Sequence, residues 1–93
     1  MATTSVRVTI RGRVQGVGYR AWAADTAREL GLTGWVRNRA DGAVEAVVSG
    51  RPETVELFLA ECRDGPRAAI VSRVESEPCD DVPTNGFKVL PDA

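Results

Sequence analysis

The chain has 93 residues, of which 43% are hydrophobic and 27% charged, and it contains no histidine. This length predicts a single domain, residues 1–93, and the composition is that of an ordinary globular protein with no stretch apolar enough to span a membrane. The absence of histidine excludes the commonest acid/base, the commonest metal ligand and every Ser/His or Cys/His nucleophile pair.

The net charge of −1 conceals an uneven distribution along the chain. Up to Arg39 there are seven arginines and two carboxylates, a balance of +5, whereas from Ala40 onward five cations accompany eleven carboxylates, a balance of −6. Nucleic-acid-binding proteins usually have an overall basic balance and a wider basic face. The positive half therefore favours a small anion as ligand, and we expect no nucleic-acid partner.

Two features bear on the compartment. Residues 1–5 lead directly into alternating strand sequence without an apolar signal segment, so we expect a cytoplasmic protein with no membrane partner. Cys62 and Cys79 are too few and too loosely spaced for a zinc site, so they are expected to be free thiols. Cys62 lies on the apolar stripe of a predicted helix and should fill the core.

In chain order, the first predicted element is a strand, because apolar and polar residues alternate from Val6 to Ile10. A helix follows from Tyr19, and Gly31 ends it, with Leu32 as the hydrophobic contact of a Schellman-type cap. The residues with helical spacing on its buried face are Ala23, Thr26, Ala27 and Leu30.

The second half of the chain begins with a predicted hairpin, in which Thr33–Arg39 and Ala43–Ser49 are joined by an Ala-Asp-Gly turn. A second helix starts at Pro52, which suits the first turn, and Gly65-Pro66 stops it. Its apolar stripe consists of Val55, Phe58, Leu59 and Cys62. Two more strands, 70–77 and 87–90, flank a polar loop.

The element order is βαββαβ plus an edge strand. This order predicts an α+β fold, a ferredoxin-like sandwich in which an antiparallel sheet of four to five strands carries two helices on one face. Such an arrangement buries the apolar stripes of both helices. The other face of the sheet should then be half polar.

The segment Gly12–Arg20 is the candidate anion site, because three glycines allow backbone N–H groups to turn inward before a helix N-terminus and Arg20 adds a forked cation. It is not a Walker loop, since no Gly-Lys-Ser/Thr follows. The spacing Gly16-x-Gly18-x-x-Ala21 fits the loose dinucleotide pattern, but the hairpin that follows argues against that fold. On glycine spacing alone, a purely structural turn is the simplest interpretation.

Two segments together resemble the signatures of the acylphosphatase family. The first is Val14 to Arg20, a Val-Gln-Gly-Val-x-aromatic-Arg run, and the second is Gly34 to Gly50, which opens with Gly-Trp-Val-Arg-Asn and has glycines at the family spacing. The resemblance extends from about Val6 to Val89. It implies a metal-independent, cofactor-free hydrolase that splits the carboxyl-phosphate anhydride of small acyl phosphates into a carboxylate and inorganic phosphate.

The resemblance also implies roles for individual residues. Arg20 matches the phosphate-binding arginine of the family, and Asn38 matches the asparagine that holds the attacking water. The phosphate cradle would consist of the backbone amides of Gln15, Gly16, Val17, Gly18 and Tyr19. Taken singly, Arg20 would be a solvated helix residue and Asn38 a polar residue near a turn. Only their pairing at the same end of adjacent elements favours a site.

The alternative is a non-catalytic, ferredoxin-like anion- or ligand-binding module. An RNA platform would need aromatic residues on the central strands, and Val6–Val14 and Ala43–Ser49 have none. With both active positions present and no partner domain in the sequence, we expect the enzyme. It should act as a monomer on a small molecule.

Overall fold

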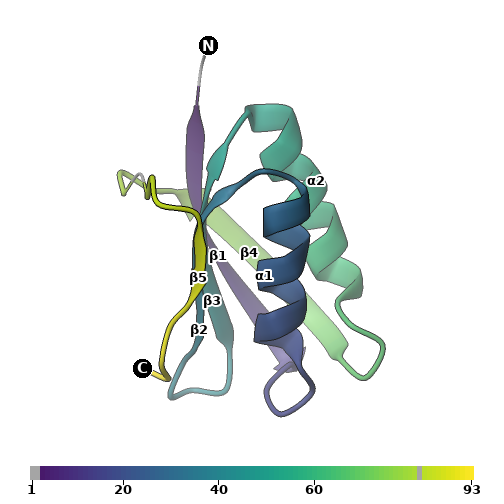
Figure 1. Ribbon diagram of the computed structural model, residues 1–93. Coiled ribbons are helices and arrows are strands. Elements are labelled where there is room, and N and C mark those ends of the chain that lie inside the picture. The colour runs from purple at the N-terminus through teal and green to yellow at the C-terminus, as the bar shows by residue number, and fades with distance from the viewer. Residues whose placement is uncertain (1–2, 82) are drawn as a thin grey trace.

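The computed structural model describes residues 3–81 and 83–93, so Met1, Ala2 and Val82 lie outside the described residues. Figure 1 shows two helices on one side of a sheet. The elements in chain order are β1 (Thr4–Arg13), α1 (Tyr19–Glu29), β2 (Thr33–Asn38), β3 (Val44–Gly50), α2 (Pro52–Asp64), β4 (Ile70–Pro78) and β5 (Phe87–Val89). The predicted α+β sandwich with βαββαβ order is confirmed, apart from small shifts at element ends.

The sheet has five strands in the order β4-β1-β3-β2-β5. One detail differs from the predicted antiparallel sheet: β5 pairs parallel with β2, although the other pairs are antiparallel. The reason lies in the connection between β4 and β5. It joins opposite edges of the sheet at one end, so β5 runs opposite to β4 and hence in the direction of β2. After β5, the chain therefore runs toward the end of β2 that carries Asn38.

The core lies between the helices and one face of the sheet. Val8 and Ile10 of β1 are fully buried there, as predicted from their alternation. From the helices, the buried side chains are Tyr19, Ala23, Ala24, Ala27, Val55, Phe58, Leu59 and Cys62. Contacts place α1 over β2 and β5, and α2 over β4 and β1. Both cysteines are free, and Cys62 fills the core as expected.

The end of α1 confirms the predicted Schellman cap. The N–H of Leu32 donates to the carbonyl of Ala27 at 2.9 Å, and that of Gly31 donates to Arg28 at 3.1 Å. Gly31 takes a φ of 72°, which glycine adopts without strain. The cap turns the chain directly into β2, and this fixes β2 alongside α1.

The sheet face without helices is half polar, as predicted, since Val47 and Trp35 lie on it among charged residues. Its central charge is Glu45, only 7% exposed, which accepts a hydrogen bond from Arg37 Nε at 2.9 Å and lies 3.5 Å from Arg7 Nε. Pairing with two guanidinium groups compensates for burying this carboxylate. No helix within residues 3–81 and 83–93 is long and apolar enough to cross a membrane.

Candidate active site

The loop between β1 and α1 has its backbone turned by glycines. Gly16 and Gly18 have φ values of 75° and 80°, and Gly18 occupies the cap position of α1. Within the part of the chain that the structure describes, no backbone carbonyl accepts a hydrogen bond from the N–H of Gly16 or Val17. The first N–H groups of any helix also lack partners within the helix. The loop and the helix start therefore offer several unpaired donors to an anion.

The start of α1 has no compensating negative group of its own. Among the described residues, no side chain caps the helix, and its first turn carries no acidic residue. A helix N-terminus left in this state favours an anion from solution, because its unpaired donors and the positive end of its dipole act together. Arg20, in that same first turn, adds a full positive charge.

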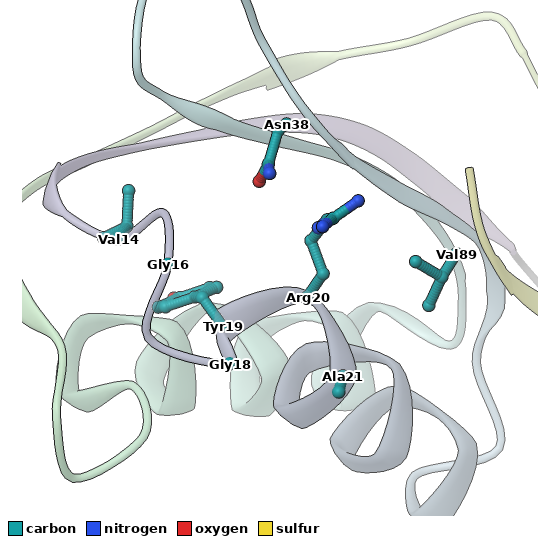
Figure 2. A pocket seen from close by; sticks show the side chains of 8 residues that line it. All are labelled: Val14, Gly16, Gly18, Tyr19, Arg20, Ala21, Asn38 and Val89. Carbon is teal, nitrogen blue, oxygen red and sulfur yellow. The ribbon is translucent and has the colours of Figure 1, made fainter. Parts of the chain in front are cut away.

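A cavity of about 260 Å³ opens in front of this loop. Figure 2 shows the loop on one side, Asn38 across from it, and the Arg20 side chain on the side of Asn38 that faces Val89. The lining residues are Val14, Gly16, Gly18, Tyr19, Arg20, Ala21, Asn38 and Val89. The structure thus brings the predicted Arg20 and Asn38 together with three of the five predicted loop residues.

Asn38 reaches the cavity because of the alternation along β2. Gly34, Val36 and Asn38 point to the helix-covered face, and Asn38 itself is only 7% exposed. Its partner in the sheet is Val44, where the hairpin turns. Burying a polar side chain at a core-facing position costs free energy unless the side chain is hydrogen-bonded. The place of Asn38 at the strand end therefore indicates a role in the cavity.

Gln15 holds the loop against this hairpin. Its Nε2 donates to the carbonyls of Arg39 at 2.8 Å and Ala43 at 2.9 Å. These two residues flank the turn immediately after Asn38, so one side chain fixes the loop relative to the strand that carries Asn38. Gln15 was predicted as a backbone donor only, and this side-chain contact is a separate, positioning role.

The remaining predicted loop residues are placed differently. Val17 does not line the cavity and packs against the core instead. Tyr19 is buried, and its hydroxyl donates to the carbonyl of Cys62 at 2.7 Å, which connects the start of α1 to α2. Burial raises the pKa of Tyr19 above its usual value. Its side chain is therefore a packing group, and only its backbone remains a candidate donor.

Arg39 and Asp41, next to Asn38, pair with each other. Arg39 Nη2 lies 3.2 Å from Asp41 Oδ2, and Arg11 approaches the same oxygen at 3.4 Å. A hydrogen bond from the N–H of Ala43, together with the two arginines, lowers the pKa of Asp41. Asp41 is thus a residue of the predicted turn, and it offsets the positive charge of Arg39 beside Asn38.

Two residues of the site were not found from sequence. Val89 of β5 lines the cavity with 44% of its surface exposed, and Asp92 accepts a hydrogen bond from Arg20 Nη1 at 3.0 Å. Both reach the site through the parallel pairing of β5 with β2. The period-two pattern predicts a last strand but carries no signal for which edge it joins.

Nothing in the cavity suggests a metal. Across residues 3–81 and 83–93, no three His, Cys, Asp or Glu side chains come together as metal ligands. The lining offers backbone amides, one guanidinium and one carboxamide, which suit an anion better than a cation.

Known proteins share this sequence and fold. The family profile for acylphosphatase matches residues 6–89. An acylphosphatase from Azorhizobium caulinodans is 51% identical over 94% of this chain and 95% of its own length, and one from Rhodopseudomonas palustris is 58% identical over 80% and 75%. The structure of an acylphosphatase from Coxiella burnetii aligns with a TM-score of 0.90 and 36% identity, covering 95% of this chain and 93% of that one. The chain therefore belongs to the acylphosphatase family of enzymes.

Proposed function

We propose that the chain hydrolyses acyl phosphates, with the loop amides and Arg20 binding the phosphoryl group and Asn38 positioning the attacking water. The observation that carries this proposal is the meeting of three features in one cavity. These are the free loop amides, the uncapped start of α1 and the Arg20–Asn38 pair. Family membership supports the hydrolase activity.

The loop side of the cavity suits the three equatorial oxygens of a phosphoryl group. The N–H groups of Gly16, Val17 and the start of α1 follow one another in the chain without backbone partners, and successive donors of this kind can form a nest that binds anionic oxygens. Arg20 supplies two donors in a plane that matches two of these oxygens. Negative charge develops on the equatorial oxygens during phosphoryl transfer, so the same contacts stabilise the transition state.

Asn38 lies across the cavity from the loop and can hold a water molecule on the far side of the phosphorus. The water oxygen attacks phosphorus while the bond between phosphorus and the acyl oxygen breaks, and the acyl oxygen leaves with the bonding electrons as a carboxylate. A carboxylate needs no protonation to leave, so a general acid is dispensable. The proton of the water passes to a phosphoryl oxygen, because none of the residues that line the cavity is a carboxylate that could accept it.

The test is hydrolysis of benzoyl phosphate by the purified chain with EDTA present. We expect full turnover in EDTA and loss of most activity in Arg20→Lys, since an ammonium cannot rebuild the forked contact. Inorganic phosphate should also inhibit Arg20→Lys more weakly than the wild type. Activity that requires added magnesium or zinc, or an Arg20→Lys enzyme with normal turnover and normal phosphate inhibition, would contradict the proposal.

A further inference from the structure

Arg20 already has an anionic partner within the chain. Its Nη1 donates to Asp92 Oδ1 at 3.0 Å, and the two residues are 72 positions apart. Residues 90–93 are held beside β2 by two backbone bonds, from Leu90 N–H to the carbonyl of Val36 and from Ala93 N–H to that of Asn38, each 2.9 Å. The segment that carries Asp92 is therefore positioned by the same strand that carries Asn38.

This contact goes with a particular direction of the Arg20 side chain. Figure 2 shows the guanidinium pointing away from Gly16 and into the space between Asn38 and Val89. A phosphoryl group bound to the loop amides would need the same guanidinium on the loop side. Carboxylate and phosphate oxygens also use the same forked donors of arginine. The carboxylate of Asp92 and a bound phosphate thus compete for one group.

We propose that Asp92 is an internal competitor for the phosphate site, which holds Arg20 in the free enzyme and must release it when phosphate or an acyl phosphate binds. This proposal rests on the assignment of Arg20 as a phosphate ligand. The pair is easily displaced, because the side chains of Arg20 and Asp92 are 34% and 67% exposed. Exposed ion pairs are weak, since water and salt screen them. Asp92 therefore sets the affinity of the site without closing it.

Asp92→Asn keeps the shape of the side chain and removes its charge. We expect the inhibition constant of inorganic phosphate and the KM for benzoyl phosphate to fall together by about twofold to fivefold, the range that an exposed ion pair supplies. Asp80→Asn is the matched control. It removes the same charge from an exposed residue next to Cys79, which bonds to Ser5 at the far end of β1. Asp80→Asn should leave both constants unchanged.

Loss of a negative charge near the cavity could by itself attract phosphate, so the effect must be shown to act through Arg20. Phosphate titrations followed by the amide chemical shifts of Gly16 and Gly18 would compare the wild type, Asp92→Asn, Arg20→Gln and the double variant. We expect Asp92→Asn to tighten binding only where Arg20 is present. An equal gain in the Arg20→Gln background would overturn the proposal.

The remaining outcomes separate this proposal from the function on which it rests. If Arg20→Gln binds phosphate as tightly as the wild type, both are wrong. If Arg20→Gln loses affinity while Asp92→Asn matches the wild type, only the competition is wrong. Weaker phosphate binding and a lower kcat in Asp92→Asn would also overturn it, because Asp92 would then be a residue that positions Arg20 for the reaction.

Discussion

The loop before α1 and strand β2, which meet at the cavity, are built by different means. In the loop, Gly16 and Gly18 are needed for the backbone conformation: both have positive φ, and no described atom beyond the adjacent residues lies within 4 Å of where a Cβ would stand. In β2, Gly34 lies outside the cavity, four residues before Asn38, and it allows β3 to come close: a Cβ there would stand 1.8 Å from the carbonyl oxygen of Val47. The loop is shaped by local backbone geometry, whereas β2 is shaped by contacts distant in sequence.

This difference separates two kinds of sensitivity. A change at Gly16 or Gly18 should affect phosphate binding more than folding, because both glycines lie between β1 and α1 and have open space where a Cβ would stand. A change in β2 can affect the chemistry through Asn38 or the whole sheet through Gly34. The following predictions test this contrast, beginning with the largest expected effect.

Asn38→Ala should separate chemistry from binding. Removing one preorganised hydrogen bond at the transition state typically costs about 2.7–4 kcal/mol, so kcat should fall roughly a hundred- to a thousandfold. The phosphate inhibition constant should change little, because Asn38 contacts the water in this mechanism. The backbone of Asn38, not its side chain, pairs with Val44, so the substitution should lower the free energy of unfolding by at most about 1 kcal/mol. A variant with normal kcat and weakened phosphate inhibition would make Asn38 a phosphate ligand.

Gly34→Ala should be the most damaging of the glycine substitutions for stability. A new methyl group against the Val47 carbonyl forces the backbones of β2 and β3 apart, and the φ of 146° adds strain. We expect a loss of about 3 kcal/mol in the free energy of unfolding in urea. Gly16→Ala is the comparison. It should lower the free energy of unfolding by only about 1 kcal/mol, because of the positive φ, but should lose more phosphate affinity than Gly34→Ala does. Equal stability losses would contradict the contrast between the loop and β2.

Gln15→Ala should loosen the connection between the loop and β2. It removes two hydrogen bonds to the carbonyls of Arg39 and Ala43, worth about 2 kcal/mol together. Both carbonyls keep a backbone donor, Gly42 N–H and Arg39 N–H respectively, so neither is left unpaired. Turnover should fall because the loop is no longer fixed relative to Asn38. Gln15→Glu should be worse than Gln15→Ala in both assays, since it aims a carboxylate at two carbonyl oxygens.

The same division, between local patterns and contacts distant in sequence, separates what could be predicted from the sequence from what could not. Alternation in β1, the apolar stripes of both helices and the Gly31 cap are local patterns, and each was found from sequence. The loop glycines before α1 are local as well, so the candidate anion site was predicted together with Arg20. The fold and the loop side of the cavity were therefore within reach of the sequence.

The rest depends on pairings between distant segments. No local pattern states that β5 lies parallel to β2, and this pairing brings Val89 and Asp92 to the cavity. The side-chain bonds of Gln15 likewise depend on how the loop meets the hairpin. Asn38 came from the family resemblance, although the alternation along β2 also places it on the buried face.

The smallest effect concerns the connection between the start of α1 and α2, and it appears only at high pH. Burial raises the pKa of the Cys62 thiol from 9.0 to about 12, and it also raises that of Tyr19. Between pH 9 and 12 the thiol keeps its proton in the native state and loses it in the unfolded state. The contribution of Cys62 to the free energy of unfolding is therefore fully present below pH 9 and is lost as the pH rises. At pH 10 the loss from Cys62 should be on the order of 1 kcal/mol. Urea unfolding under reducing conditions at pH 7, 9, 10 and 11 would measure this loss.

Cys62→Ala is the control. It should be less stable at pH 7, because it leaves a cavity, yet its free energy of unfolding should decline less steeply above pH 9. An unchanged decline in Cys62→Ala would assign the alkaline sensitivity to other groups, with Tyr19 the first to examine through Tyr19→Phe.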